Sequence, residues 1–327
     1  MEKNEQKLNK TEIPIDLANY KGIKVRRKNL EISQDEINKI LDYLQQSRAK
    51  IITVNGPAKK GNRVEIDFEV RHGGTRIEDG VSKNHPLILG EGRFLPGFEE
   101  KIEGMKAGEE RNFFLKVPEN WSDKRICDKN LDFTVKMNLV QEREIPDLNN
   151  EFAKSLGNFD SLDILKKSIS EGLMGEKEAK ERQRIRLELI EKVADNSKME
   201  IPAELIEQEL EVMEKELKFT VEGLGLDFEK YLNEIRKTRE ELKKDWQIQA
   251  EKRVGIAVCL KAIADKENIN VSEEEINERV NQDLKNYQNT EEAKKNIDHR
   301  ALREYTKEVL RNEKVFGLLE KEAKIII

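Results

Sequence analysis

The segment "GEGRFLPGF", residues 90–98, decides how the middle of this chain is interpreted. It places three glycines, one proline and three large apolar side chains in nine positions. Such a composition suits a phosphate-binding loop, a plain turn or an apolar binding pocket. The spacing of its glycines and the residues around it decide among the three.

The phosphate interpretation fails on that spacing. A dinucleotide-binding GxGxxG loop needs its third glycine where Leu95 stands. The segment "GPAKKGNR", residues 56–63, has the glycine spacing of a Walker A loop. However, Asn62 and Arg63 replace the lysine and the hydroxyl residue that contact phosphate and magnesium. Neither segment therefore predicts nucleotide binding.

Predicted strands lie on both sides of the opening segment. Residues 64–70, "VEIDFEV", and residues 131–139, "LDFTVKMNL", alternate apolar with polar side chains, as half-buried strands do. "HPLILG" and "NFFLKV" are predicted as further strands, and "PGFEEKIEGM", residues 96–105, as a short helix that ends near Gly104. The region 57–142 is therefore interpreted as a small antiparallel sheet packed against one helix.

Helical periodicity dominates the rest of the chain. Ser33 and Glu36 form a capping box at the start of one amphipathic helix before residue 56. Beyond residue 142 the apolar spacing is helical throughout, and two further capping boxes mark helix starts. They are formed by Thr238 with Glu241 and by Ser272 with Glu275. We expect long helices whose apolar faces pack on each other or on another molecule.

Composition argues against several classes of protein. The 327 residues include 60 Lys and Arg and 66 Asp and Glu, with both signs interspersed, so no nucleic-acid partner is expected. The longest apolar run, "VGIAVCL", is far shorter than the roughly 20 residues that span a bilayer, and no signal peptide begins the chain. Cys127 and Cys259 form no CxxC pair, which fits a reducing compartment. We expect a cytoplasmic protein with no membrane partner.

Metal and acid–base chemistry find no support in the polar residues. His72, His85 and His299 are scattered and have no metal-ligand spacing, so neither a metal nor a cofactor is expected. The adjacent Glu99 and Glu100 are interpreted as a solvated helix face. The remaining candidate chemistry depends on shape and on the exclusion of water.

An ordered set of segments carries a family resemblance. "VEIDFEV", "LILGEGRFLPGFEEKIEGMKAGEE", "VPENW" and "LDFTVKMNLV" together resemble an FKBP-type peptidyl-prolyl isomerase domain. "EIPDLNNEFAKSLG", "MEIPAELIEQELEVM" and "KRVGIAVCLKAIADKENINVSEEEINERV" are similar to the junction and the helical body of the trigger factor family of bacterial folding chaperones. The resemblance extends over the chain from about residue 12.

The resemblance implies an α+β multidomain fold. In it, a small FKBP-like antiparallel sheet with one short helix is inserted in, or attached to, an extended all-α helical body with arms. The expected domains are a linker strand and helix packing on the helical body (1–56), the isomerase domain (57–142) and the helical chaperone domain (143–327). The implied function is a chaperone with prolyl isomerase activity on unfolded or newly made polypeptides.

By motif position, the resemblance implies an apolar catalytic pocket, with the backbone N–H of Leu95 donating to the substrate carbonyl. Its lining residues would be Phe68, Phe94, Leu95, Phe98, Trp121 and Phe133. The physical requirement agrees, because rotation about an X–Pro bond passes through a twisted, less polar amide that an apolar slot favours. The strand alternation alone would also explain Phe68 and Phe133 as core residues. Phe113 and Phe114 are interpreted as core and edge.

Two positions depart from the family pattern. Ile77, followed by Glu78, stands where an aromatic residue followed by an acid is usual, and His85 stands where FKBP domains often place an aromatic ring. We include all three as substrate-binding positions at the border of the pocket. The changes leave an apolar site but reduce the isomerase efficiency that the resemblance would imply.

The helical region offers four apolar candidates for contact with clients: Met213, Leu217, Phe219 and Phe316. Periodicity does not distinguish a client surface from an internal seam, and internal seams are the commoner explanation of such stripes. A holdase chaperone with a weak or inactive isomerase domain is therefore the alternative function. A structural coiled-coil protein is disfavoured because no heptad pattern is sustained.

The resemblance has one larger gap. Trigger factors begin with a ribosome-binding domain that carries a "GFRxGxxP" loop, and this sequence contains no such motif. Docking at the ribosome in the usual manner of the family is therefore not predicted.

Overall fold

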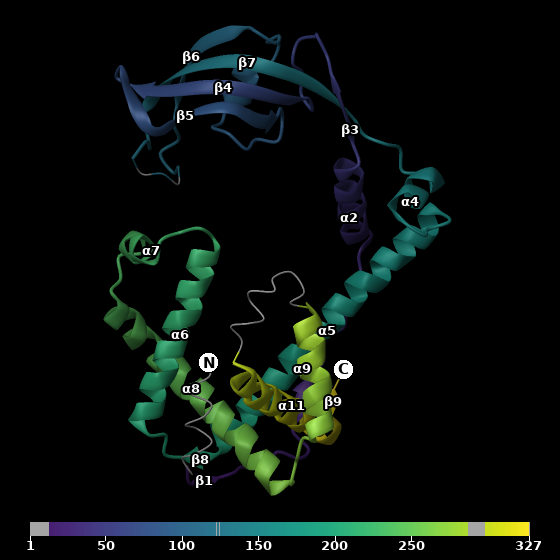
Figure 1. Cartoon of the computed structure of the whole chain (residues 1–327), viewed down its shortest axis with the longest axis vertical. Coiled ribbons are helices and arrows are strands. Elements are labelled where there is room, and N and C mark those ends of the chain that lie inside the picture. Colours follow the sequence, from purple (N-terminus) through teal and green to yellow (C-terminus); the bar gives the residue numbers. More distant parts are fainter. Residues whose placement is uncertain (1–12, 122, 124, 287–297, 327) are drawn as a thin grey trace. The chain divides into compact units, whose positions relative to one another are not determined.

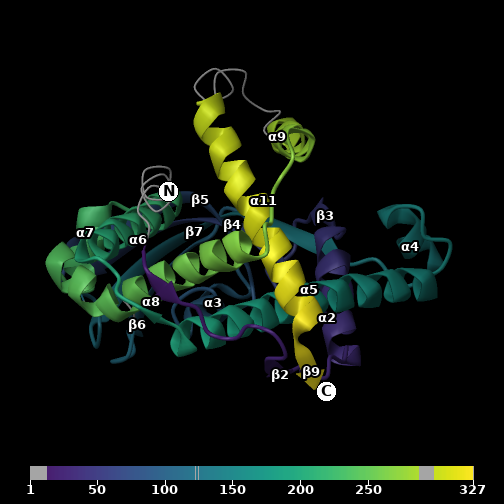
Figure 2. The same ribbon diagram turned by 90° about the horizontal axis from the view of Figure 1, so that it is seen from below.

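The computed structural model describes residues 13–121, 123, 125–286 and 298–326 (Figures 1 and 2). The chain divides into two compact units, and both divisions lie outside the predicted isomerase domain. One unit is residues 31–174, and the other combines the segment before residue 31 with residues 175–327. The mixed α+β class is confirmed. The domain boundaries predicted at 56/57 and 142/143 remain a prediction, since the compact units follow a different division.

A five-stranded antiparallel sheet forms most of the first unit. Its strands are β3 (Lys50–Thr53), β4 (Arg63–His72), β5 (Thr75–Ile88), β6 (Glu110–Lys116) and β7 (Asn130–Glu144). The order is β3-β7-β4-β5, and β6 also pairs with β7. The two alternating segments predicted as strands are the neighbours β4 and β7, in a register that sets Val70 opposite Phe133. The apolar alternation of these strands thus supplies one face of the core.

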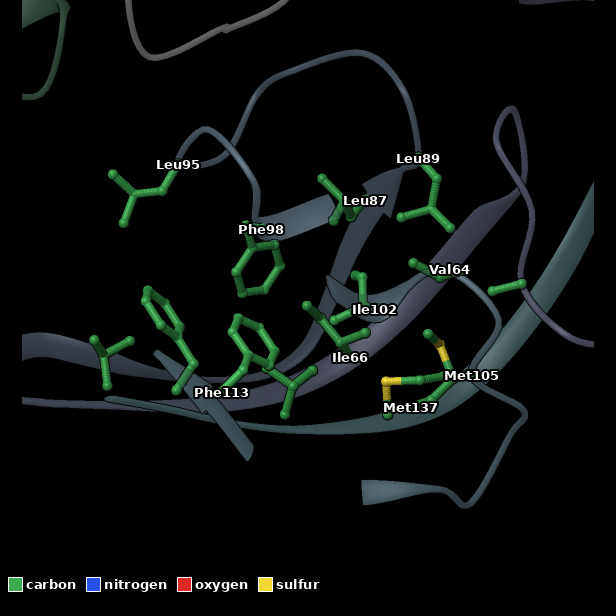
Figure 3. Close-up of a cluster of buried hydrophobic side chains, with 14 of the residues drawn as sticks. Val64, Ile66, Leu87, Leu89, Leu95, Phe98, Ile102, Met105, Phe113 and Met137 are labelled. Carbon is green, nitrogen blue, oxygen red and sulfur yellow. The ribbon is translucent and has the colours of Figure 1, made fainter. Parts of the chain in front are cut away.

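The short predicted helix is α3 (Phe98–Ile102). It begins after Gly97, whose φ of 86° lies in the left-handed region that glycine adopts without strain. A side chain at Gly97 would also bring its Cβ to 3.3 Å from the Leu115 side chain. Phe98 and Ile102 are fully buried against the strands (Figure 3). The helix therefore closes the apolar face of the sheet.

A smaller core joins three helical segments of the same unit. These are α2 (Gln34–Ser47), α4 (Asn150–Leu156) and the first part of α5 (Leu162–Asn196). Leu41 of α2 packs with Phe152 and Leu165. The predicted capping box of Ser33 and Glu36 is confirmed, with both reciprocal hydrogen bonds present.

The second unit is built from long helices. Its helical elements are the rest of α5, α6 (Ala203–Gly223), α7 (Phe228–Glu234), α8 (Arg239–Lys266), α9 (Glu273–Asn286) and α11 (His299–Glu322). Leu189, Ile190, Ile263 and Leu319 are buried at the centre of its largest core, where α5, α8 and α11 meet. The predicted capping boxes at the starts of α8 and α9 are confirmed.

Two short β ladders also belong to this unit. One is antiparallel, between β1 (Ile15–Asp16) and β8 (Lys198–Met199). The other is parallel, between β2 (Lys24–Arg26) and β9 (Lys324–Ile326). The extended character of the segment around β2 was expected, whereas its partner at the end of the chain was not. Among the described residues, no helix is both long enough and apolar enough to cross a bilayer.

Candidate active site

Six rings from six separate segments meet in the first unit. They are Phe68 on β4, His85 on β5, Phe94 in the loop after β5, Phe98 on α3, Phe113 on β6 and Phe133 on β7. We call this set the aromatic cluster. The structure brings together four of the six residues predicted as catalytic, with His85, which was predicted as a substrate-binding position, and with Phe113. Phe113 was expected to be core, and it is buried, while its neighbour Phe114 is exposed.

Phe98 is the centre of the cluster. Its ring points from α3 toward the strands (Figure 3) and lies 5.3 Å from the Phe133 ring and 5.6 Å from the Phe113 ring, between centroids. The Phe94 ring stacks on it at 4.0 Å. Phe98 is 0% exposed, so the predicted floor lies entirely beneath other side chains. A client group reaches the Phe98 ring only when a covering side chain, such as that of Phe94, moves aside.

Three partly exposed rings form a border around this centre. Phe68 lies edge-on to Phe94 at 5.3 Å and to His85 at 5.4 Å. His85 and Phe94 are themselves 5.8 Å apart. Edge-to-face arrangements at these distances are favourable for aromatic pairs. The alternation that placed Phe68 in the core did not show that its ring stays partly exposed beside two others.

Leu95 follows Phe94 in the loop that leads to α3. Its side chain is buried, and its carbonyl accepts a hydrogen bond from the Phe98 N–H at 2.9 Å. Within the described part of the chain, the N–H of Leu95 itself has no hydrogen-bond acceptor. An unpaired backbone donor beside an apolar pocket is what the predicted role of this N–H requires.

Trp121, in the loop between β6 and β7, and Ile77, on β5, pack against the core that contains Phe98, Phe113 and Phe133, and both are partly buried. An ion pair joins this loop to β5, in which the Arg125 guanidinium lies 3.1 Å from the Glu78 carboxylate. Hydrogen bonds from Arg125 also hold the pKa of Asp123 below its usual value. Both partners of the Glu78 pair are well exposed, so it orients the loop against β5 and stabilises the structure little.

Glu99 is the functional residue that the sequence interpretation placed wrongly. It was expected on a solvated helix face, but it is only 9% exposed. Its carboxylate accepts hydrogen bonds from the backbone N–H groups of Gly90 at 2.5 Å and Arg93 at 3.1 Å. The physical signal was available, since a tight glycine loop leaves N–H groups that need acceptors. Glu99 therefore ties the loop that carries Phe94 to the helix that carries Phe98.

Replacing Glu99 with glutamine should loosen this loop. The amide keeps one acceptor oxygen but turns an N–H₂ group toward the second backbone donor. We expect the free energy of unfolding of this unit to fall by about 1–3 kcal/mol and prolyl isomerisation to slow by roughly tenfold. Glu100→Gln is the matched control, because Glu100 is exposed. Chemical unfolding and peptide isomerisation rates measure both effects, and equal behaviour of the two variants would contradict the role of Glu99.

The four client candidates separate by burial. Met213 is buried between α6 and α8, so the structure places it in a seam and not at the surface. Leu217 is partly buried in the core beside α7, and Phe316 is partly buried beneath the Arg186 guanidinium. Phe219, in contrast, is 81% exposed. Of the four, Phe219 alone offers a large free apolar surface.

The described residues contain no group of three or more His, Cys, Asp or Glu arranged to hold a metal ion. His72 instead uses its ring nitrogen on the Asn130 carbonyl, at 2.9 Å. The chemistry that the described cluster offers is apolar contact together with a backbone donor.

Two family models match this chain. A model described as FKBP-type peptidyl-prolyl cis-trans isomerase matches residues 55–138, which contain the whole aromatic cluster. A model described as bacterial trigger factor protein (TF) C-terminus matches residues 161–320. The two matches follow one another along the chain, in the order that the sequence resemblance implies.

Relatives named trigger factor align with nearly the whole chain. The protein of Carboxydothermus hydrogenoformans is 34% identical over 311 residues, which are 94% of this chain and 72% of that protein. The protein of Caldicellulosiruptor saccharolyticus is 30% identical over 311 residues, covering 95% and 71%. A solved structure described as "Promiscuous Substrate Recognition in Folding and Assembly Activities of the Trigger Factor Chaperone" covers 95% of this chain and 73% of its own, with a TM-score of 0.52 at 18% identity. That likeness shows a shared fold.

Proposed function

The chain belongs to the trigger factor family, and from this premise we propose that the aromatic cluster is the site where its isomerase domain catalyses the cis–trans isomerisation of X–Pro bonds. As a trigger factor, it is a chaperone that carries an FKBP-type peptidyl-prolyl cis-trans isomerase domain and acts on substrate polypeptides. The observation that carries the site proposal is the convergence of the Phe94, Phe113 and Phe133 rings on Phe98, beside a Leu95 N–H that has no acceptor among the described residues.

The reaction explains why such a site suffices. Rotation about the X–Pro amide loses resonance and meets a barrier of about 20 kcal/mol, but no covalent bond forms or breaks. The twisted amide is less polar than the planar one, so an apolar wall stabilises it more than it stabilises the ground state. In our proposal, Phe68, Phe94 and Phe133 surround the proline ring. The N–H of Leu95 holds the carbonyl oxygen of the preceding residue while the bond turns.

Entry into the site requires one movement. Because Phe98 is 0% exposed and Phe94 stacks on it, we propose that the Phe94 ring swings aside and becomes a wall of the occupied pocket. Phe94 lies in the loop after β5, whose path depends on Glu99. A loop held by one carboxylate permits this movement more readily than a regular strand would.

We propose a client-binding surface at the far end of α6. Phe219, Leu224 and Leu226 are 81%, 74% and 52% exposed, and they lie on the last turns of α6 and on the link to α7 (Figure 1). Large apolar groups gathered at the surface favour contact with apolar segments of other chains. The clients of such a surface are unfolded or newly made polypeptides with exposed apolar residues. We call these three residues the α6 tip.

Two assays on three proteins test the proposed function. Wild type, Phe219→Ser with Leu224→Ser, and Tyr43→Ser are compared in a proline-limited refolding assay and an aggregation assay. Tyr43 is the matched control, since it is 71% exposed in the other unit. We expect the double variant to bind unfolded protein roughly tenfold more weakly, since burial of about half of each side chain by a client contributes about 1.5 kcal/mol from the two together. Its rate on short prolyl peptides should stay unchanged.

Two outcomes would contradict the proposal. If the wild type fails to accelerate proline-limited refolding at catalytic concentrations, the cluster is not an efficient isomerase site. If the Tyr43 variant loses aggregation suppression as much as the double variant does, the α6 tip has no special part in client binding.

One observation favours the alternative of a holdase with a weak isomerase. The floor residue Phe98 is wholly covered, so each catalytic event needs a rearrangement. Under this alternative the wild type suppresses aggregation fully and accelerates peptide isomerisation only slightly. We propose the cytoplasm as its location, because the free thiols of Cys127 and Cys259 fit a reducing compartment.

A further inference from the structure

His85 is the one ring of the aromatic cluster that carries polar atoms. It stands at the border of the proposed pocket, edge-on to Phe68 and Phe94, and is partly buried. Within the described part of the chain, neither nitrogen of its imidazole has a hydrogen-bond partner. The protein therefore leaves this polar group for solvent or for a ligand to satisfy.

Among the described residues, the charged groups on the neighbouring strands form no hydrogen bond with the His85 imidazole. On β4, Asp67 accepts hydrogen bonds from the Asn84 N–H at 2.8 Å and from the Asn138 side chain at 2.6 Å. The bond from Asn84, the larger cause, holds the pKa of Asp67 below its usual value, so this carboxylate stays ionised. Lys83 on β5 is exposed and has no ion-pair partner among the described residues.

The remaining charged groups nearby are already paired. In the loop that carries Phe94, the Arg93 guanidinium lies 2.8 Å from the Glu91 carboxylate. On β4, Glu65 pairs with Arg63 at 2.9 Å. Lys83 acts electrostatically on the ionised Asp67 carboxylate and helps to lower its pKa.

A client that binds beside His85 removes water from the imidazole. If the client presents only apolar groups there, the ring nitrogens lose their hydrogen bonds, and a polar group that is buried without a partner is destabilising. If the client presents a carboxylate, the imidazole N–H donates to it, and such charge-assisted bonds are the stronger kind. A pocket wall of carbon atoms alone would not make this distinction.

We propose that His85 is a specificity-determining residue, which directs the isomerase site toward X–Pro bonds with an aspartate or glutamate next to the proline. The inference rests on the proposed function, because it assigns a substrate class to the same site. It also predicts a dependence on pH. Histidine is the side chain whose charge ordinarily changes between about pH 5 and 8, and a protonated imidazole attracts a carboxylate more strongly.

The test measures cis–trans exchange by NMR on three tetrapeptide series. These carry Glu, Gln or Leu next to proline, on its N-terminal side in one set and on its C-terminal side in another. The full chain is compared with His85→Phe, which keeps an aromatic ring and removes both nitrogens. For the wild type we expect kcat/KM for Glu relative to Gln to be about fivefold higher at pH 5.5 than at pH 8.5 on one side of the proline. For His85→Phe we expect the two ratios to be equal.

The outcomes separate this inference from the proposed function. If the wild type isomerises none of the peptides, the proposed site itself fails. If it isomerises the Leu series but its Glu-to-Gln ratio is the same at both pH values and matches that of His85→Phe, the role of His85 is overturned. If His85→Phe does not fold, the pH dependence of the wild-type ratio alone decides, and a ratio that does not change with pH overturns the proposal.

Discussion

Replacing Phe98 with leucine is expected to lower kcat/KM for prolyl peptide isomerisation by about 100-fold, which corresponds to roughly 2.7 kcal/mol of transition-state stabilisation. The reason is the central place of its ring, which contacts Phe94, Phe113 and Phe133 at once. Leucine keeps much of the apolar volume and removes the flat surface on which the Phe94 ring and, in our proposal, the proline rest. Peptide exchange measured by NMR gives the rate.

The control for this prediction is Phe113→Leu. Phe113 belongs to the same cluster and is also buried, but we assign it to the core and not to the pocket. Chemical unfolding should show a similar loss of stability in both variants, of about 1–2 kcal/mol, whereas only Phe98→Leu should lose activity. Suppression of aggregation should remain at the wild-type level in both. A Phe98→Leu variant with normal kcat/KM would remove the aromatic cluster from the mechanism.

Protonation or removal of the Glu320 carboxylate is expected to destabilise the helical unit substantially. This carboxylate on α11 receives hydrogen bonds from Arg182 and Arg186 of α5, and the Nε of each lies 2.7 Å from the same oxygen. The bonds from Arg182, the larger cause, and from Arg186 lower the pKa of Glu320 to about 2. Its side chain is 18% exposed, so solvent screens the network only in part. The ion pairs thus join α5 and α11, which also share a hydrophobic core.

The sign of the pH effect follows from that lowered pKa. An unfolded glutamate titrates near pH 4.3, so the stabilisation is fully present above about pH 4.5 and is lost as the pH falls toward 2. At neutral pH it amounts to at most about 3 kcal/mol, since one pKa unit corresponds to about 1.4 kcal/mol. Glu320→Gln should lower the free energy of unfolding at pH 7 by a large part of this amount. Urea unfolding at pH 7 and pH 3 measures it, and the difference between variant and wild type should shrink at the lower pH.

Glu176→Gln is the matched control for this second prediction. Glu176 pairs with Lys180 on the exposed face of α5, at 2.5 Å, and both side chains are more than half exposed. An exposed pair of this kind contributes about 0.5 kcal/mol or less. A Glu320 variant that is no less stable than the Glu176 variant would show that the network contributes orientation and little energy.

Local patterns predicted the elements that depend on local physics. The alternation in β4 and β7 and the capping boxes at Ser33 and Thr238 specify backbone conformation within a few residues, and all were found as expected. The parallel pairing of β2 with β9 could not be predicted in the same way. It joins segments about 300 residues apart, and each strand has only three residues, too few for a periodic signal.

The candidate site, too, was predicted from the sequence only where neighbouring residues determine it. The segment "GEGRFLPGF", through its resemblance to a known family, predicted Phe94, Leu95 and Phe98 as neighbours of a bound proline, because the chain itself holds them within five positions. Only the tertiary structure decided that Glu99 turns inward to the backbone of this loop, that His85 has no polar partner among the described residues, and that Met213 is buried while Phe219 is exposed. The physical reason is that burial and pairing depend on which distant groups arrive at a side chain. The residue type and its spacing carry no record of those neighbours.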